Sequence, residues 1–141
     1  MENNETEPYI DTDIIICLLT SDDIRKQKAS AALFDKVYNG KLILLAPTTV
    51  IADAVFVLSS PRLYNIPRKE IRDMLSSLIK IPNFKVENKQ IVLDALDLYT
   101  SYNLDFGDSL LAACVGQTKR KAIYSYDHDF DRIEGIERKE P

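Results

Sequence analysis

The chain has 141 residues, of which 45% are hydrophobic and 28% charged, and its formal net charge at pH 7 is −4. This length predicts one domain with its own core, and the acidic balance excludes a protein that coats nucleic acid through a basic surface. The N-terminal residues, MENNETEPY, show neither a basic nor an apolar signal segment. We therefore expect a cytoplasmic protein without a membrane segment, with a disordered or extended tail at residues 1–8 and a single domain at 9–141.

The first half of the chain alternates short apolar segments with helical patterns. We expect a brief strand at residues 9–11, a buried helix at 13–19, a helix at 22–38, a buried strand at 41–46 and a helix from Pro47 to Leu58. A loop with two prolines follows. Apolar residues at helical spacing then predict an amphipathic helix at 68–80.

The second half repeats this alternation. We expect a strand at 84–86, helices around 91–99 and 105–117, a strand at 122–124, at most a helical turn at 129–133 and a last edge strand at 135–137. Strands that alternate with helices predict a parallel sheet covered on both faces. Cys17 and Cys114 lie in apolar helical segments, which favours core packing in a reducing compartment over a disulfide or a zinc site.

Single aspartates stand where several of these apolar segments end, at positions 11, 53, 108, 127 and 129. Asp11 closes the first strand, Asp53 lies in the second turn of a helix that follows a strand, Asp108 lies in the first turn of its helix, and Asp127 follows the strand at 122–124. In open α/β sheets the ligand site lies beyond the carboxyl ends of the strands. We therefore expect four segments to deliver carboxylates to the same edge of one sheet.

Carboxylates that converge in this way need a cation. Two of them about 4 Å apart repel by roughly 4 kcal/mol at an effective dielectric constant near 20. Ligands that are all oxygen atoms favour Mg²⁺ or Mn²⁺. The pattern therefore predicts a divalent metal site.

Each aspartate also has a structural alternative. Asp105 and Asp108 can cap a helix N-terminus, Asp53 can lie on a solvated stripe of its helix, and turn chemistry alone accounts for Asp127 and Asp129. His128, the only histidine, is flanked by acids and is expected to be exposed rather than to bind metal.

Four motifs, YIDTD, PTTVIADAVFVL, YNLDFGDSLLAACV and IYSYDHDF, occur in an order that resembles the PIN domain family, in particular its VapC-type toxin ribonucleases. The resemblance implies a PIN-like three-layer α/β/α fold with a central, mainly parallel sheet of four to five short strands. It matches Asp11, Asp108 and Asp127 to the first, third and fourth family acids. Asp53 stands where the family usually has a glutamate, so its carboxylate reaches about 1.3–1.5 Å less far.

The resemblance also implies roles. Asp11, Asp108 and Asp127 are expected to hold Mg²⁺ or Mn²⁺, and Asp53 to orient the attacking water in phosphodiester hydrolysis or to help hold the metal. Supporting residues are Thr12 after the first acid, Asp105 one turn before Asp108, Ser125 at the family's hydroxyl position and Asp129 in the final motif. The expected partners are an RNA substrate, a cognate antitoxin and a second copy in a homodimer.

RNA is expected to approach over basic residues. One group follows the Asp53 helix and consists of Arg62, Arg68, Lys69 and Arg72; a second is Lys119-Arg120-Lys121, which can also complement a helix C-terminus. Two rival functions stay open. The chain can be a catalytically degenerate PIN domain that acts as a binding module, or a haloacid-dehalogenase-type phosphatase with Asp11 as nucleophile.

Overall fold

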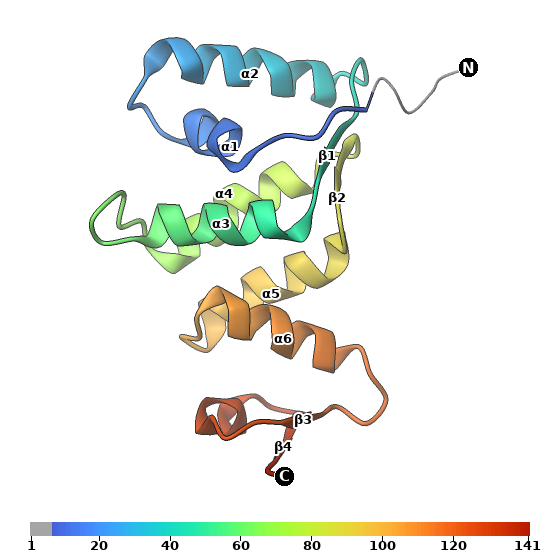
Figure 1. Ribbon diagram of the computed structural model, residues 1–141. Coiled ribbons are helices and arrows are strands. Elements are labelled where there is room, and N and C mark those ends of the chain that lie inside the picture. Colours follow the sequence, from blue (N-terminus) through green and yellow to red (C-terminus); the bar gives the residue numbers. More distant parts are fainter. Residues whose placement is uncertain (1–6) are drawn as a thin grey trace. The chain divides into compact units, whose positions relative to one another are not determined.

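Figure 1 shows the computed structural model, which describes residues 7–141. The chain divides into two compact units, the first ending at Lys89 and the second running from Gln90 to Pro141. Residues 1–6 of the predicted N-terminal tail lie outside the described residues. Between residues 7 and 141, no helix has both the length and the apolar character that crossing a membrane requires.

The helices of the first unit are α1 (Thr12–Leu19), α2 (Ile24–Tyr38), α3 (Thr48–Ser59) and α4 (Arg68–Ile79). Asp11 and Asp23 cap α1 and α2, because their carboxylates accept backbone hydrogen bonds of the first turn. Extended prolines precede α3 and α4. In the core of this unit α1 packs against α2 and α3, and α3 packs against α4.

Two short parallel strands, β1 (Leu44–Ala46) and β2 (Phe84–Val86), form the sheet of the first unit. Tyr9 adds a parallel bridge to Leu45, with Ile10 N donating to Leu45 O at 3.0 Å. Parallel pairing places the carboxyl ends of the segment around Tyr9 and of β1 at the same edge. The helices that follow these segments, α1 and α3, therefore begin at that edge.

The second unit contains α5 (Lys89–Ser101), α6 (Phe106–Gly116), β3 (Ala122–Tyr124), a short 3-10 helix η2 (His128–Arg132) and β4 (Glu137–Lys139). β3 and β4 are parallel, with Ile123 opposite Arg138. The small core of the unit consists of Leu104, Ala112, Val115, Ile123, Phe130 and Ile133. This core fixes η2 and the strand ends against α6.

These elements confirm the α/β class that the alternating pattern predicts, with short parallel strands between helices. Among residues 7–141 the strands form two separate pairs, one in each unit. The last strand was expected at 135–137 but begins at Glu137. Gly135 has a φ of +87°, a turn conformation that cannot continue a strand.

Two burial expectations are wrong. Only Ile15 is fully buried in α1, because neighbouring helices cover part of its surface and its other apolar side chains stay half-buried. Cys114 is exposed, while Ala113 and Val115 beside it in α6 are buried, so its thiol points away from the core. Cys17 is half-buried.

Candidate functional site

Asp11 and Thr12 lie at the beginning of α1. Asp11 Oδ1 accepts a hydrogen bond from Thr12 N at 2.7 Å, and the carboxylate is exposed. The Thr12 hydroxyl donates to the carbonyl of Val50 at 3.4 Å, which ties the start of α1 to the first turn of α3. Thr12 therefore supports the packing of the two helix starts at the strand edge.

Asp53 follows Val50 by three residues on α3, which is about one helical turn. Its neighbours Ala54 and Val55 are buried, but Asp53 itself is exposed. Between residues 7 and 141 its carboxylate has no hydrogen-bond or ion-pair partner, so an exposed, unpartnered acid stands one turn beyond the Thr12 contact. This exposure also fits the alternative of a solvated stripe.

Asp105 and Asp108 begin α6. Asp105 caps the helix, its Oδ1 accepting from Asp108 N at 2.7 Å, while Ser109 Oγ donates to the Asp105 carbonyl at 2.9 Å. The capping interpretation of Asp105 is thus confirmed, whereas among residues 7–141 no backbone N–H donates to the Asp108 carboxylate. Partial burial and the negative charges of Asp105, Asp127 and Asp129 raise the pKa of the Asp108 carboxyl above its usual value.

Asp127 and Asp129 lie in the turn that leads from β3 into η2. Asp127 Oδ1 accepts from Asp129 N at 2.9 Å, and Asp127 N donates to Ser125 Oγ at 2.9 Å. The Ser125 hydroxyl, which was expected to orient a carboxylate, accepts this hydrogen bond from the backbone of the turn. Asp129 also forms an ion pair with Arg132 at 3.4 Å.

Arg138 is a residue of this region that sequence analysis missed. Its guanidinium donates to Asp131 Oδ1 at 2.9 Å, to the Ser125 carbonyl at 2.8 Å and to Glu140 Oε2 at 2.7 Å. Arg138 and His128 lower the pKa of Asp131. In the sequence Arg138 stands among charged residues near the C-terminus and looks like a solvent-exposed side chain. No sequence pattern therefore indicated its contacts.

The predicted site residues thus fall into two local groups. Asp11, Thr12 and Asp53 belong to the first unit, and Asp105, Asp108, Ser125, Asp127 and Asp129 belong to the second. In the second unit, burial and the negative charges of Asp105, Asp127 and Asp129 raise the pKa of Asp108. Nevertheless, within the described part of the chain no three His, Cys, Asp or Glu side chains form a group that could hold a metal ion.

The first predicted basic group lies around the start of α4. Arg62 is in the exposed turn before it, and Arg68, Lys69 and Arg72 are in its first turns, Arg72 pairing with Asp73 at 3.1 Å. The Tyr64 hydroxyl of this loop donates a hydrogen bond to Asp22, which raises the pKa of Tyr64.

Two residues of the second basic group, Lys119 and Arg120, line a pocket of about 410 Å³ in the second unit, together with residues of β3 and β4, whereas Lys121 lines a different pocket. Its walls include Lys119, Arg120, Lys139 and the exposed ring of Tyr124. Between residues 7 and 141 these three basic side chains form no ion pair. The pocket therefore combines uncompensated positive charge with an aromatic surface.

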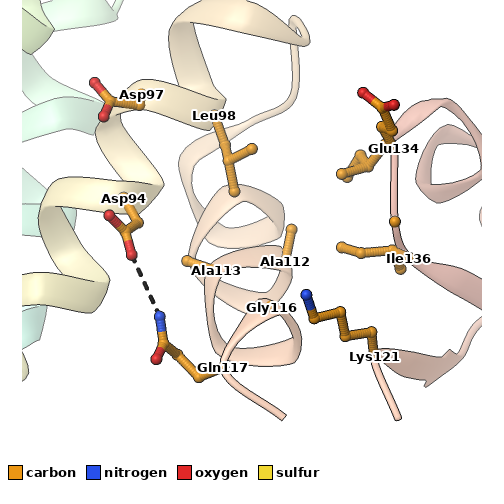
Figure 2. A pocket seen from close by; sticks show the side chains of 12 residues that line it. Asp94, Asp97, Leu98, Ala112, Ala113, Gly116, Gln117, Lys121, Glu134 and Ile136 are labelled. Carbon is orange, nitrogen blue, oxygen red and sulfur yellow. Dashed lines mark hydrogen bonds between the residues drawn. The ribbon is translucent and has the colours of Figure 1, made fainter. Parts of the chain in front are cut away.

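Figure 2 shows a different pocket of about 340 Å³, formed by α5, α6 and residues 133–136. Asp94 on its wall accepts a hydrogen bond from Gln117 Nε2 at 3.4 Å, and Asp97 and Glu134 lie at one end of the view. None of the predicted catalytic acids lines it. We therefore do not assign this pocket to the candidate site.

The sequence matches the PIN domain family over residues 9–136, nearly the whole chain. The chain therefore belongs to the PIN domain family, and the PIN-like α/β fold class predicted from its motifs is confirmed. PIN domains are typically metal-dependent nucleases, which makes a nuclease, a hydrolase of phosphodiesters, the activity indicated by family membership. No curated protein matches the chain.

Proposed function

We propose that the protein is a metal-dependent endoribonuclease of VapC type that acts in the cytoplasm as the toxin of a toxin–antitoxin pair. The proposed catalytic acids are Asp11, Asp53, Asp108 and Asp127. Family membership supports nuclease activity. The single observation that carries the proposal is the match to the PIN domain family over residues 9–136. The negative charges of Asp105, Asp127 and Asp129 that act on partly buried Asp108 are charges that a divalent cation would offset.

The donor chemistry fits Mg²⁺ or Mn²⁺, because every proposed ligand is a carboxylate oxygen. We assign Asp11, Asp108 and Asp127 to the metal, and Asp127 has Oδ2 available because Oδ1 caps η2. When bound, the ion lowers the pKa of a coordinated water and offsets charge on the scissile phosphate. Asp53, exposed and unpartnered, orients the attacking water or helps to hold the metal.

Several residues act in supporting roles in this proposal. Thr12 fixes the start of α1 on α3, Asp105 caps the helix that carries Asp108, and Ser125 holds the turn that carries Asp127. Asp129 stays close enough to Asp108 to raise its pKa. We further propose that RNA phosphates contact the basic group around α4, and that the protein forms a homodimer and binds a cognate antitoxin.

The first experiment measures the melting temperature against Mn²⁺ concentration for wild type, Asp108→Asn and Asp53→Asn. A ligand that binds only the folded state stabilises it by about 2.7 kcal/mol at 100 times its Kd. We expect wild type to gain several degrees and both variants to lose most of that gain. Asp35→Asn is the matched control, because Asp35 is an exposed aspartate of α2 outside the proposed site.

A parallel assay follows cleavage of a labelled RNA with and without EDTA. Metal-dependent cleavage that Asp108→Asn abolishes supports the ribonuclease. Metal-dependent stabilisation without cleavage supports the alternative binding module. Absence of any Mn²⁺ response in wild type would contradict the metal site.

A further inference from the structure

The segment from Ser125 to Asp131 carries Asp127 and Asp129 and connects β3 to η2. The hydrogen bonds within this segment join residues that are two positions apart in sequence. Asp127 N donates to Ser125 Oγ, and Asp129 N donates to Asp127 Oδ1. Ser125 is half-buried, whereas residues 126–129 are exposed. Local bonds between exposed groups compete with water, so they define the shape of the turn but hold it weakly in place.

Besides Phe130, whose side chain is buried in the core, Arg138 of β4 anchors this segment. Its guanidinium donates to the Ser125 carbonyl at 2.8 Å, before the aspartates, and to Asp131 Oδ1 at 2.9 Å, after them. A third nitrogen, Nη2, lies 3.0 Å from Nδ1 of His128. One side chain therefore bonds both ends of the segment that presents Asp127.

The strand pair fixes Arg138 in turn. Arg138 stands opposite Ile123, whose side chain is in the core, and Ser125 N donates to the carbonyl of Lys139 at 2.9 Å. The Arg138 side chain is only 11% exposed. A guanidinium held this firmly presents its donors in a rigid fork, which a lysine ammonium cannot reproduce.

The ion pairs of Arg138 favour a positioning role for this residue over a role in binding RNA. Arg138 is bonded to two carboxylates, Asp131 and Glu140, which also raise its pKa. Its positive charge is thus already compensated, and little of the side chain reaches solvent, so it is poorly suited to contact a phosphate. Arg138 therefore contributes by fixing the position of the turn and not by binding RNA.

We propose that Arg138 is a positioning residue that holds the Ser125–Asp131 segment so that the carboxylate of Asp127 stays in a metal-binding orientation. This inference rests on the proposed function for the role of Asp127. The contacts themselves do not depend on it. Residues that orient metal ligands through such contacts change metal affinity or activity by about 10–100-fold when they are replaced.

The test compares Arg138→Gln and Arg138→Lys with two controls. Glu140→Gln removes a partner of Arg138 but leaves its bonds to the turn, and Arg25→Gln removes an exposed arginine of α2 with the same change in charge. The first readout is amide hydrogen exchange at Asp127 and Asp129 in metal-free protein. The second is the Kd for Mn²⁺ measured by calorimetry.

We expect Arg138→Gln to speed exchange of both amides on the order of tenfold and to weaken Mn²⁺ binding by about 10–100-fold. Arg138→Lys should resemble it, because a single ammonium cannot bond both ends of the segment. Both controls should match wild type. Should Arg138→Gln fail to fold, Arg138→Lys, which keeps the charge and the alkyl stem, provides the same comparison.

The proposal is overturned if a folded Arg138 variant exchanges these amides and binds Mn²⁺ like wild type. It is also overturned if exchange accelerates but Mn²⁺ affinity is unchanged, because the turn would then not serve the metal. If wild type itself binds no Mn²⁺, the proposed function fails and this role fails with it. Unchanged exchange together with tight wild-type binding instead refutes the role of Arg138 alone.

Discussion

The charge of Asp108 lowers the stability of the folded protein at neutral pH. The Asp108 carboxyl has a raised pKa, caused first by partial burial and then by Asp105, Asp127 and Asp129. A raised pKa in the folded state means that the folded protein binds the proton more tightly than the unfolded chain does. The contribution of Asp108 to stability is therefore present below about pH 3.9 and lost as the pH rises through the raised value.

Asp108→Asn should consequently melt higher than wild type in metal-free buffer at pH 7. Removal of a charge that is partly buried and lies near other carboxylates is worth roughly 0.5 kcal/mol, or about 2 °C. The difference should vanish near pH 3, where the wild-type carboxyl is protonated. Thermal melts at both pH values check this expectation, and equal melting temperatures at pH 7 would contradict it.

A substitution at Asp53 can test whether the short aspartate side chain limits the rate of RNA cleavage. The family usually has a glutamate here, and Asp53 is exposed and unpartnered, so a longer side chain meets no burial penalty. We expect Asp53→Glu to raise the RNA cleavage rate by about 10-fold, which is a part of the roughly 10²–10⁴-fold attributed to a well-placed acid–base group. Asp53→Gln, equal in length but uncharged, is the control. If Asp53→Glu leaves the cleavage rate unchanged, the length of the aspartate side chain does not limit catalysis.

At the scale of elements, periodic patterns predicted much of the fold. The spacing of Ile71, Leu75, Leu78 and Ile79 predicted α4, and all four side chains are buried. The strand at 84–86 has the predicted bounds because Phe84 and Val86 face the core and Lys85 faces solvent. The capping role of Asp105 also followed from its position before an apolar helix.

Features that depend on contacts distant in sequence were not predictable. Periodicity could not tell that neighbouring helices would leave most of α1 half-buried, or that Cys114 would face away from the core. Arg138 bonds residues up to 13 positions earlier, and nothing in its local sequence marks such a contact. The aspartates were recognisable from motif order, whereas the residues that hold their backbone were not.

The pocket between the α6–β3 connection and the β3–β4 pair makes a prediction about RNA. Lys119, Arg120 and Lys139 lack ion-pair partners within the described residues, and Tyr124 offers an exposed ring. Lys119→Ala combined with Lys139→Ala should weaken RNA binding. The slope of the binding constant against salt concentration, both as logarithms, should fall by about one unit for each phosphate that these lysines no longer bind.

Fluorescence anisotropy over a salt series, with a catalytically inactive background, measures this slope. Lys36→Ala combined with Lys41→Ala is the matched control, because both are exposed lysines of the first unit. A slope equal to that of wild type in the Lys119 and Lys139 variant would show that RNA does not contact this pocket.

At the scale of the whole molecule, we propose that residues 9–141 fold as a single domain, although the chain divides into two compact units. The second unit has a core of few residues, and chains of this size are only marginally stable alone. We therefore expect one cooperative transition in scanning calorimetry, with equal calorimetric and van't Hoff enthalpies. Two resolved transitions would contradict this proposal.

The exposed thiol of Cys114 has a practical consequence for the proposed homodimer. In air, two chains can become linked through this sulfur, and such a covalent dimer would appear in sizing experiments whatever the native association. Oligomer measurements therefore need a reductant or a Cys114→Ser variant. A dimer that persists in both conditions reflects association between folded surfaces, and one that disappears reflects oxidation.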